Sequence, residues 1–207
     1  MNLLFIIDPL ETLKIEKDTS FLMMREAQHR RHQIWVATPK EIKFLGDKVV
    51  VNAQQLLIND ESENWYEVTE SKDLISPNLD CIIMRKDPPF DMEYVYSTYL
   101  LEALENEGCR VFNRPQSIRD FNEKLAITKY PQFIAPSLVT ADLTAIKSFI
   151  KNHKEVVLKP LDGMGGSSVF RSRPDDPNLG VILETLTELG CRTIMVQKFI
   201  PQISAGD

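Results

Sequence analysis

The sequence predicts an α/β fold in its first part and an α+β fold in its second. Residues 79–113 read as a strand, an amphipathic helix and a second strand, a βαβ unit that implies a parallel sheet. Residues 155–172 hold two strand-like runs joined by a glycine-rich loop instead of a helix, so these strands are expected to be antiparallel. The change from a βαβ pattern to strands joined by a loop predicts two domains, 1–121 and 122–207.

Apolar runs and helix signals define the first domain. We expect strands at 2–8, 33–38, 79–85 and 109–113, a hairpin at 44–51, and helices at 18–31 and 91–107. Asp18 and Asp91 are suited to cap the two helices, because a carboxylate accepts hydrogen bonds from free N–H groups at a helix start. Gly108 is expected to end the second helix.

The second domain mixes short helices and strands. We expect helices at 119–130, 142–152 and 178–190, and strands at 155–159, 167–172 and 192–200. Asn178 is the expected cap of the last helix and Gly190 its stop. Residues 201–207 are expected to form neither a helix nor a strand, which suggests a tail or a chain cut inside a domain.

Composition excludes several classes of protein. The chain has 207 residues, is 43% hydrophobic and carries a net charge of −6, which argues against a broad nucleic-acid-binding surface. Three separated cysteines without a CxxC pair favour a reducing compartment over a disulfide framework or a zinc site. No apolar run approaches a membrane span, and the N-terminus lacks the pattern of a signal peptide. We therefore expect a cytoplasmic protein that binds neither membranes nor nucleic acids.

The stretch VVLKPLDGMGGSSVF, residues 156–170, contains the main functional signal. Glycines allow a ligand to approach the main chain, and successive N–H groups can bind an anion. Lys159 adds a positive charge just before the loop, so phosphate is the natural ligand. A mobile surface loop without function is the alternative reading of these residues alone.

The order of lysine, glycines and strands distinguishes among phosphate-binding loops. A P-loop and a dinucleotide-binding loop both open a helix, whereas a strand follows here. A protein kinase places its lysine on the strand after the glycine loop. A lysine that precedes a glycine-rich flap between antiparallel strands is typical of ATP-grasp ligases.

Longer motifs make the resemblance specific. IIDPLETLKIEKDTSF (6–21), MRKDPPFDMEYVYSTYLLE (84–102), NRPQSIRDFNEKL (113–125), LKPLDGMGGSSVFR (158–171) and DPNLGVILETLTELG (176–190) occur in order along the whole chain. They resemble bacterial glutathione synthetases, members of the ATP-grasp superfamily. The resemblance implies a Rossmann-like, substrate-binding pre-ATP-grasp domain, followed by the first part of an ATP-grasp domain.

The resemblance also implies an activity. Family members join γ-glutamylcysteine to glycine with ATP, through an acyl phosphate, and release glutathione, ADP and phosphate. Mg²⁺ or Mn²⁺ assists, and the proteins form tetramers or dimers. A ligase for another carboxylate and amine, or a non-catalytic nucleotide-binding module, remains an alternative.

The family's ATP-binding residues map onto the second domain. Lys124 and Lys159 match lysines that reach the phosphates, and the strand VQKFI (196–200) matches the segment beside the adenine. The full set implied by the resemblance is Lys124, Lys159, Gly163, Gly165, Gly166, Ser167, Ser168, Gln197, Phe199, Ile200 and Asp207. Closure of the loop would exclude water from an easily hydrolysed acyl phosphate.

Two residues of the first domain are candidates for binding the dipeptide. Arg85 and Asp8 each follow a buried strand, and ligands of open α/β sheets bind beyond the carboxyl ends of strands. A loop-stabilising ion pair is the alternative role for both.

The resemblance places the metal ligands beyond Asp207, because family members continue well past this point. Residues 60–63 (DESE) are acidic, but a solvated loop explains them better than a metal site. These 207 residues are then expected to lack the ligands for two divalent ions. We therefore expect this stretch alone to be inactive, although the whole protein is a ligase.

Overall fold

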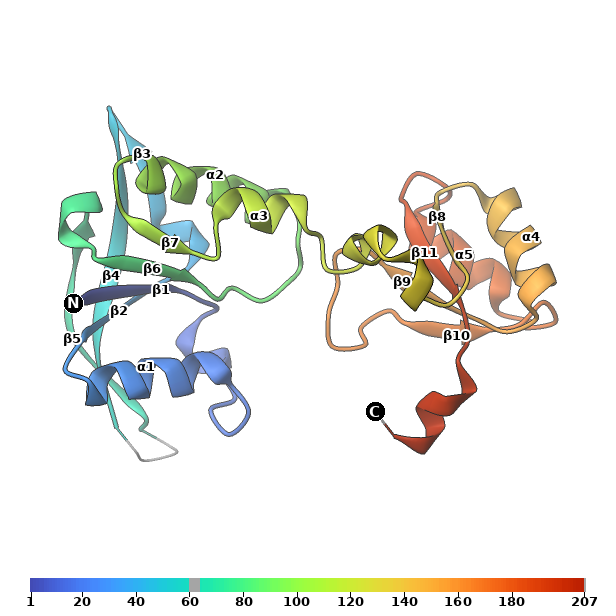
Figure 1. The fold of residues 1–207 in the computed structure, drawn as a ribbon, viewed down its shortest axis with the longest axis horizontal. Helices are drawn as coiled ribbons and strands as arrows, with labels where there is room; N and C mark the ends of the chain where they lie inside the picture. The colour runs from blue at the N-terminus through green and yellow to red at the C-terminus, as the bar shows by residue number, and fades with distance from the viewer. Residues whose placement is uncertain (60–63, 207) are drawn as a thin grey trace. The chain divides into compact units, whose positions relative to one another are not determined.

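The computed structural model describes residues 1–59 and 64–206 and divides into two compact units, Met1–Asp120 and Phe121–Asp207 (Figure 1). Each unit has its own sheet and its own hydrophobic core. The division falls one residue before the expected domain boundary. The acidic stretch 60–63 and Asp207 lie outside the described residues. No described helix is both long and apolar enough to cross a membrane.

The first unit is built on a mixed sheet that has seven strands among the described residues. Its strands are β1 (Asn2–Ile6), β2 (Gln33–Ala37), β3 (Ile42–Leu45), β4 (Lys48–Ile58), β5 (Tyr66–Leu74), β6 (Cys81–Met84) and β7 (Arg110–Phe112). The order is β3-β4-β2-β1-β6-β7, and β5 pairs with β4. Strands β2, β1, β6 and β7 are parallel, whereas β3, β4 and β5 form an antiparallel meander. The expected parallel sheet is therefore only part of a larger mixed one.

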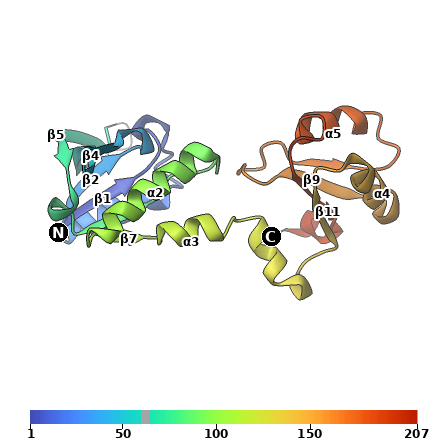
Figure 2. The same ribbon diagram turned by 90° about the horizontal axis from the view of Figure 1, so that it is seen from above.

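Helices cover both faces of this sheet (Figure 1), and Figure 2 shows α2 over one of them. Helix α1 (Thr19–His29) packs Phe21 and Met24 against one face, and α2 (Met92–Asn106) packs Leu101 and Leu104 against the other. Helix α3 (Pro115–Asp120) lies beside α2 and adds Ile118 to the same core. Alternate residues of the central strands β1 and β2 enter two cores on opposite faces of the sheet, because successive side chains of a strand point to opposite faces.

The predicted helix caps of the first unit are confirmed. The Asp18 carboxylate accepts hydrogen bonds from the N–H groups of Ser20 and Phe21, at 2.6 and 3.0 Å. The Asp91 carboxylate accepts one from Tyr94, at 2.9 Å. Gly108, with φ +100°, follows the end of α2 as expected.

The second unit is a four-stranded antiparallel sheet with two helices against it. Its elements are β8 (Ser137–Thr140), α4 (Leu143–His153), β9 (Val156–Pro160), β10 (Phe170–Ser172), α5 (Leu179–Thr187) and β11 (Ile194–Lys198). The order β10-β9-β11-β8 confirms that the glycine-rich loop joins antiparallel neighbours. Helices α4 and α5 both pack against the face that carries Leu158 and Val196.

Some sequence expectations for the helices are wrong. The helix expected at 119–130 is interrupted, because α3 ends at Asp120 and a 3-10 helix spans Leu125–Lys129. Asn122 causes the break, since its side chain binds the N–H groups of Lys124 and Leu125 in place of the backbone. Asn178 makes no side-chain cap, and Pro201–Ala205 form a 3-10 turn where no helix was expected.

Other expectations have the wrong length or were missed. The strand expected at 167–172 begins only at Phe170, because Gly166 and Ser168 adopt positive φ values that a strand does not allow. Helix α5 ends at Thr187, before Gly190, because Glu188 and Leu189 also have positive φ. Strands β5 and β8 had no counterpart among the expected elements; β5 is largely exposed and charged, so it lacks alternation.

Candidate functional site

Lys159 lies on β9, on the sheet face opposite the helices. Its neighbours Leu158 and Pro160 are buried, whereas the side chain of Lys159 is half-buried and pairs across the sheet with Met195. Burial lowers the pKa of the Lys159 ammonium, and the positive charge of Lys124 lowers it further; Glu123 acts in the opposite sense. A cation in this position is poised to gain from an incoming anion.

Lys124 approaches the same place from the segment before the 3-10 helix. Its ammonium donates hydrogen bonds to the main-chain carbonyl of Gly163 and to the Glu123 carboxylate, the latter at 2.9 Å. The side chain of Lys124 is 12% exposed, whereas that of Glu123 is 64% exposed. The structure thus brings Lys124 to Lys159 and the glycine-rich loop, both of which follow it in the sequence by 35 residues or more.

The glycine-rich loop itself is held in turns that need glycine. Gly165 and Gly166 have φ values of +62° and +76°, and Ser168 also has a positive φ of +56°. The N–H of Ser167 donates to the carbonyl of Met164 at 3.1 Å, and the N–H of Val169 donates to that of Gly166 at 3.2 Å. A Cβ on Gly163 would meet the Pro160 side chain at 3.4 Å.

The root of the loop is fixed by an ion-pair cluster. Arg192 donates to both carboxylate oxygens of Asp162 at 2.6 Å and also binds Glu188 at 3.2 Å. Asp162 is the second residue after β9, so this pair anchors the point where the loop leaves the sheet. Neither Asp162 nor Arg192 was among the expected site residues, because their 30-residue separation carries no local signal.

The end of β11 holds the residues expected beside adenine. The Gln197 side-chain amide donates to Ser137 Oγ at 2.8 Å, across the β11–β8 pair. The Arg171 guanidinium lies 3.8 Å from the centroid of the Phe199 ring, and Ile200 is 52% exposed. Asp207, the last expected residue, lies outside the described part of the chain. An exposed apolar side chain beside an aromatic ring suits contact with a flat heterocycle.

In the first unit, Arg85 extends from the carboxyl end of β6. Its guanidinium donates to Ser20 Oγ at 3.0 Å and to Thr19 Oγ1 at 2.7 Å, both at the start of α1. These partners are neutral hydroxyls, so they orient the guanidinium without compensating its charge. Thr19 and Ser20 hold the Arg85 guanidinium, and no pattern in the sequence linked them to it.

Asp8, which follows β1, is engaged by the loop that follows β6. Its carboxylate forms an ion pair with Lys86 at 2.7 Å and accepts the N–H of Asp87 at 2.9 Å. These contacts are those of the loop-stabilising role that was the alternative to substrate binding. Burial raises the pKa of the Asp87 carboxyl, and the negative charges of Asp8 and Asp18 raise it further.

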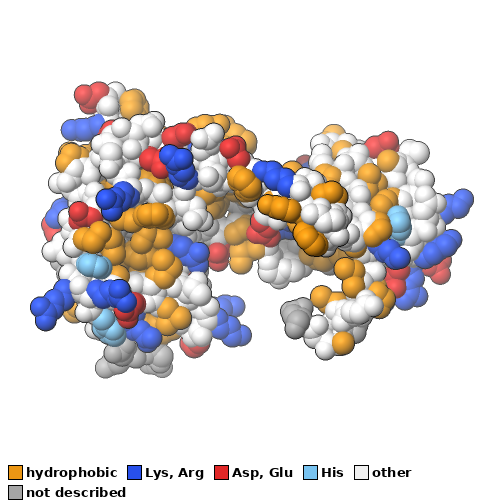
Figure 3. Space-filling model, viewed as in Figure 1, with side chains coloured by type: hydrophobic (Ala, Val, Ile, Leu, Met, Phe, Trp, Pro, Cys, Tyr) orange, Lys and Arg blue, Asp and Glu red, His pale blue; other side chains and the backbone are white. Residues whose placement is uncertain are grey.

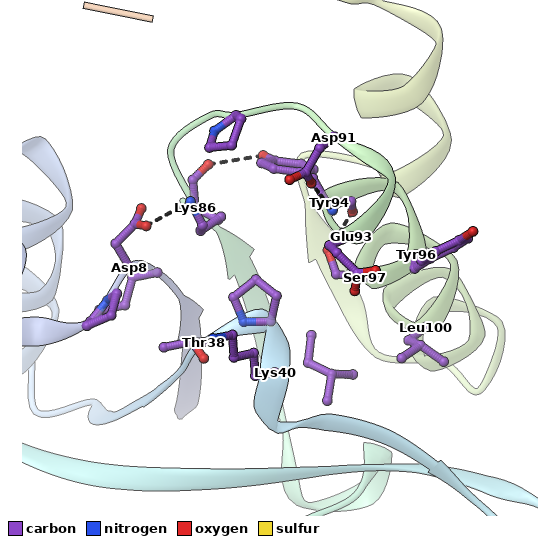
Figure 4. Close-up of a pocket in the computed structure, with 15 residues that line it drawn as sticks. Asp8, Thr38, Lys40, Lys86, Asp91, Glu93, Tyr94, Tyr96, Ser97 and Leu100 are labelled. Atoms are coloured by element: carbon purple, nitrogen blue, oxygen red, sulfur yellow. Dashed lines mark hydrogen bonds and ion pairs between the residues drawn. The ribbon is translucent and has the colours of Figure 1, made fainter. Parts of the chain in front are cut away.

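A pocket of about 510 Å³ opens beside this loop in the first unit (Figure 4). Asp8 and Lys86 line one side, Thr38 and Lys40 a second, and α2 a third. Tyr94 of α2 donates its hydroxyl to the carbonyl of Lys86 at 3.1 Å. Burial, together with the negative charge of Asp87, raises the pKa of Tyr94 to about 12. The phenol therefore stays protonated at neutral pH and donates to the loop that precedes α2.

Metal ligands do not gather in the described residues: no group of three or more His, Cys, Asp or Glu side chains there could hold an ion. On the face of the first unit seen in Figure 3, described Lys and Arg side chains are interspersed with Asp and Glu. That mixture is not the basic field that binds nucleic acids.

Comparison with known proteins decides the family. Residues 1–119 match the N-terminal domain of prokaryotic glutathione synthetase, and residues 123–207 match its ATP-grasp domain. This chain belongs to the prokaryotic glutathione synthetase family. The assignment confirms the resemblance inferred from the motifs.

Curated relatives support the same family. The glutathione synthetase of Nitrosomonas europaea is 49% identical over 210 residues, which cover 100% of this chain and 66% of the relative. That of Ralstonia nicotianae is 47% identical over 207 residues, covering 100% and 64%. The chain therefore spans slightly less than two thirds of the length of these glutathione synthetases.

Solved structures share the fold. A RimK-domain ATP-grasp protein from Sphaerobacter thermophilus matches 97% of this chain and 64% of its own, with a TM-score of 0.62 and 17% identity. D-cycloserine synthetase matches 98% and 61%, with a TM-score of 0.60 and 14% identity. At such identities the likeness concerns the fold alone, and it confirms the predicted ATP-grasp architecture of this glutathione synthetase family member.

Proposed function

We propose that the natural protein carrying this chain is a glutathione synthetase that joins γ-glutamylcysteine to glycine with ATP. The observation that carries the proposal is the meeting of Lys124, Lys159 and the glycine-rich loop in a member of this family. Two cations and a loop rich in main-chain N–H groups suit a polyphosphate. We place the reaction in the cytoplasm and expect a homo-oligomer, a tetramer or a dimer.

ATP would lie against the second unit. Lys124 and Lys159 would bind its phosphates, Gly163, Gly165, Gly166, Ser167 and Ser168 would cover them, and Gln197, Phe199, Ile200 and Asp207 would contact adenosine. We expect Lys124 to exchange its contact with the Gly163 carbonyl for one with a phosphate oxygen. That exchange would free the loop to close over the nucleotide, and closure would exclude water from the reacting groups.

The reaction would proceed in two steps. The carboxylate of the cysteine residue attacks the γ-phosphorus of ATP, which forms an acyl phosphate and releases ADP. The glycine amine then attacks the acyl carbon, phosphate leaves with the former carboxylate oxygen, and the nitrogen loses a proton. Positioning and charge neutralisation by the two lysines would supply the main contribution of this chain.

The dipeptide would bind at the carboxyl ends of the parallel strands in the first unit. Arg85, held by Thr19 and Ser20, is oriented to receive a substrate carboxylate in a bidentate contact. Asp8 would act through Lys86 and the 86–87 backbone. Mg²⁺ or Mn²⁺ is expected with ATP, although the described residues contain no group of three or more His, Cys, Asp or Glu side chains that could hold an ion.

Coupled ADP release tests the proposal. The natural full-length protein and the 207-residue chain are each given ATP and γ-glutamylcysteine, and glycine is added last. We expect glycine-dependent ADP release from the full-length protein and none from the shorter chain. ATP binding without glycine-dependent turnover in the full-length protein would instead indicate a nucleotide-binding module, and turnover with another amine a different ligase.

A further inference from the structure

Residues 122–124 run beside the first half of the glycine-rich loop and bind it at two points. The Asn122 side-chain amide donates to the carbonyl of Leu161 at 3.2 Å, and the Lys124 ammonium donates to the carbonyl of Gly163. The donors are two residues apart, and so are the acceptors. This matched spacing fixes the register between the segment and the loop.

The other end of the Asn122 side chain organises the backbone that carries Lys124. Its Oδ1 accepts the N–H groups of Lys124 and Leu125, both at 3.0 Å. Only one orientation of the amide satisfies both sets of partners, because backbone N–H groups need an acceptor and the Leu161 carbonyl needs a donor. Asn122 therefore uses both halves of its amide, one towards the loop and one towards the chain of Lys124.

Other small polar residues would satisfy only part of this arrangement. Aspartate at position 122 would keep the acceptor and lose the donor. Serine caps N–H groups well, but its hydroxyl is too close to the backbone to reach Leu161 at the same time. Asparagine is thus the residue that joins a cap to a tether, and the Lys124 segment gains its position from both.

We propose that Asn122 is a positioning residue for ATP binding: it ties the segment that carries Lys124 to the root of the glycine-rich loop. Through this tether Lys124 stays in register with Lys159 and the loop when its ammonium leaves the Gly163 carbonyl for a phosphate. The inference rests on the proposed function, because it assigns Asn122 a part in placing the nucleotide phosphates. Asn122 itself touches neither of the reacting groups.

Three variants of the natural full-length protein separate the tether from the cap. Asn122→Ala removes both, and Asn122→Ser keeps the cap alone. Asp142→Ala is the matched control, since Asp142 caps α4 through the N–H groups of Thr144 and Ala145 at 2.8 and 3.3 Å, as Asn122 caps its own turn. Each variant is measured for Tm and for the KM of ATP and of glycine.

We expect Asn122→Ala and Asn122→Ser to raise the KM for ATP about five- to tenfold, because each variant loses one tethering hydrogen bond. The KM for glycine should remain unchanged. Asn122→Ser should keep nearly the wild-type Tm. Asp142→Ala should lower Tm about as much as Asn122→Ala and leave the KM for ATP unchanged. A wild-type KM for ATP in Asn122→Ser, or a raised one in Asp142→Ala, would overturn the proposal.

A second readout does not depend on ATP. Amide hydrogen exchange at Ser167 and Val169 reports the tether, because their N–H groups donate within the loop to the carbonyls of Met164 and Gly166, and loss of the Asn122–Leu161 bond frees the root of that loop. We expect faster exchange there in Asn122→Ser than in the wild type, and no change in Asp142→Ala. Unchanged exchange in Asn122→Ser refutes the tether. A wild-type protein that fails to bind ATP refutes the proposed function, and with it the part of Asn122 in ATP binding, but not the tether itself.

Discussion

Lys159 and Lys124 form one paired cation site: burial lowers the pKa of the Lys159 ammonium, and the positive charge of Lys124 lowers it further. The two positive charges repel one another until an anion binds between them. The repulsion is a cost of the free protein that a triphosphate would relieve. Under the proposed function, this repulsion disfavours the empty site and favours the bound nucleotide.

Replacing Lys124 by methionine should raise the pKa of Lys159. The neighbouring charge disappears, but burial remains, so the pKa should stay below the usual lysine value of about 10.4. Titration of Lys159 by NMR, with isotope-labelled lysine side chains, measures the shift. Lys129→Met is the control, because Lys129 lies over the Phe121 ring, 3.5 Å from its centroid, and does not contribute to the lowered pKa. An unchanged pKa in Lys124→Met would show that the two charges do not interact.

Lys159→Met should stabilise the free protein while it weakens ATP binding. Methionine keeps the packing of the stem and removes a half-buried charge, so the free energy of unfolding should rise by about 0.5–1 kcal/mol, as for other stabilising substitutions at functional sites. Chemical denaturation and nucleotide titration measure the two effects. A destabilised variant would indicate that the ammonium makes favourable contacts in the free protein.

The stability gain of Lys159→Met should depend on pH in a defined direction. The folded pKa of Lys159 is lowered, so between this value and the unfolded value the unfolded chain binds more protons and wild-type stability rises with pH. The gain of the variant should be complete below the lowered pKa and disappear as pH approaches the unfolded value. Denaturation curves over the alkaline range test the sign, and a gain that grows with pH would contradict it.

The sequence predicted the local parts of the site better than their partners. Lys159 and the glycine-rich loop are adjacent, so their chemistry and the antiparallel strands around them could be inferred from one stretch. The contact between Lys124 and Gly163 spans 39 residues, and only the family resemblance pointed to Lys124. The bonds of Arg85 to Thr19 and Ser20 span more than 60 residues and follow from the packing of α1 beside β6.

The same limit explains the errors in the fold. Strand β5 contains the charged residues Glu67, Glu70, Lys72 and Asp73, and among the described residues it pairs with β4 alone. Because this edge strand is exposed on both faces, its sequence shows no alternation of apolar and polar residues. The helix expected through Asn122 follows intrinsic propensity, but a side chain that binds backbone N–H groups overrides propensity. Both features depend on contacts that the sequence does not display locally.

Gly166→Ala and Gly180→Ala should have opposite effects. Gly166 has a φ of +76° in open space, so an added Cβ meets no atom within 4 Å and the cost, about 1–2 kcal/mol, is purely conformational. Gly180 lies in α5 with equally open surroundings, and alanine there should stabilise by about 0.5–1 kcal/mol. If the reaction requires this loop conformation, the same free energy lowers its population, so turnover should fall about five- to thirtyfold in Gly166→Ala. It should remain unchanged in Gly180→Ala. Equal turnover in both variants would show that the loop conformation does not matter for the reaction.

Arg85→Lys should raise the KM for γ-glutamylcysteine while the KM for ATP remains unchanged. Lysine keeps the charge but loses the planar fork, so it cannot bind Thr19 and Ser20 and still present two donors to a carboxylate. A bidentate pair lost to a single contact should cost about 1–2 kcal/mol, or five- to thirtyfold in KM. Steady-state kinetics of the full-length protein, with each substrate varied in turn, give the comparison.

Ser20→Ala separates orientation from charge at the same site. It removes the hydrogen bond to Arg85 Nε and leaves the guanidinium itself in place. We expect a smaller rise in the KM for the dipeptide than in Arg85→Lys, about two- to fivefold, because the Thr19 contact still restrains the side chain. If both variants keep the wild-type KM for the dipeptide, Arg85 serves only to join β6 to α1, and the carboxylate must be bound elsewhere.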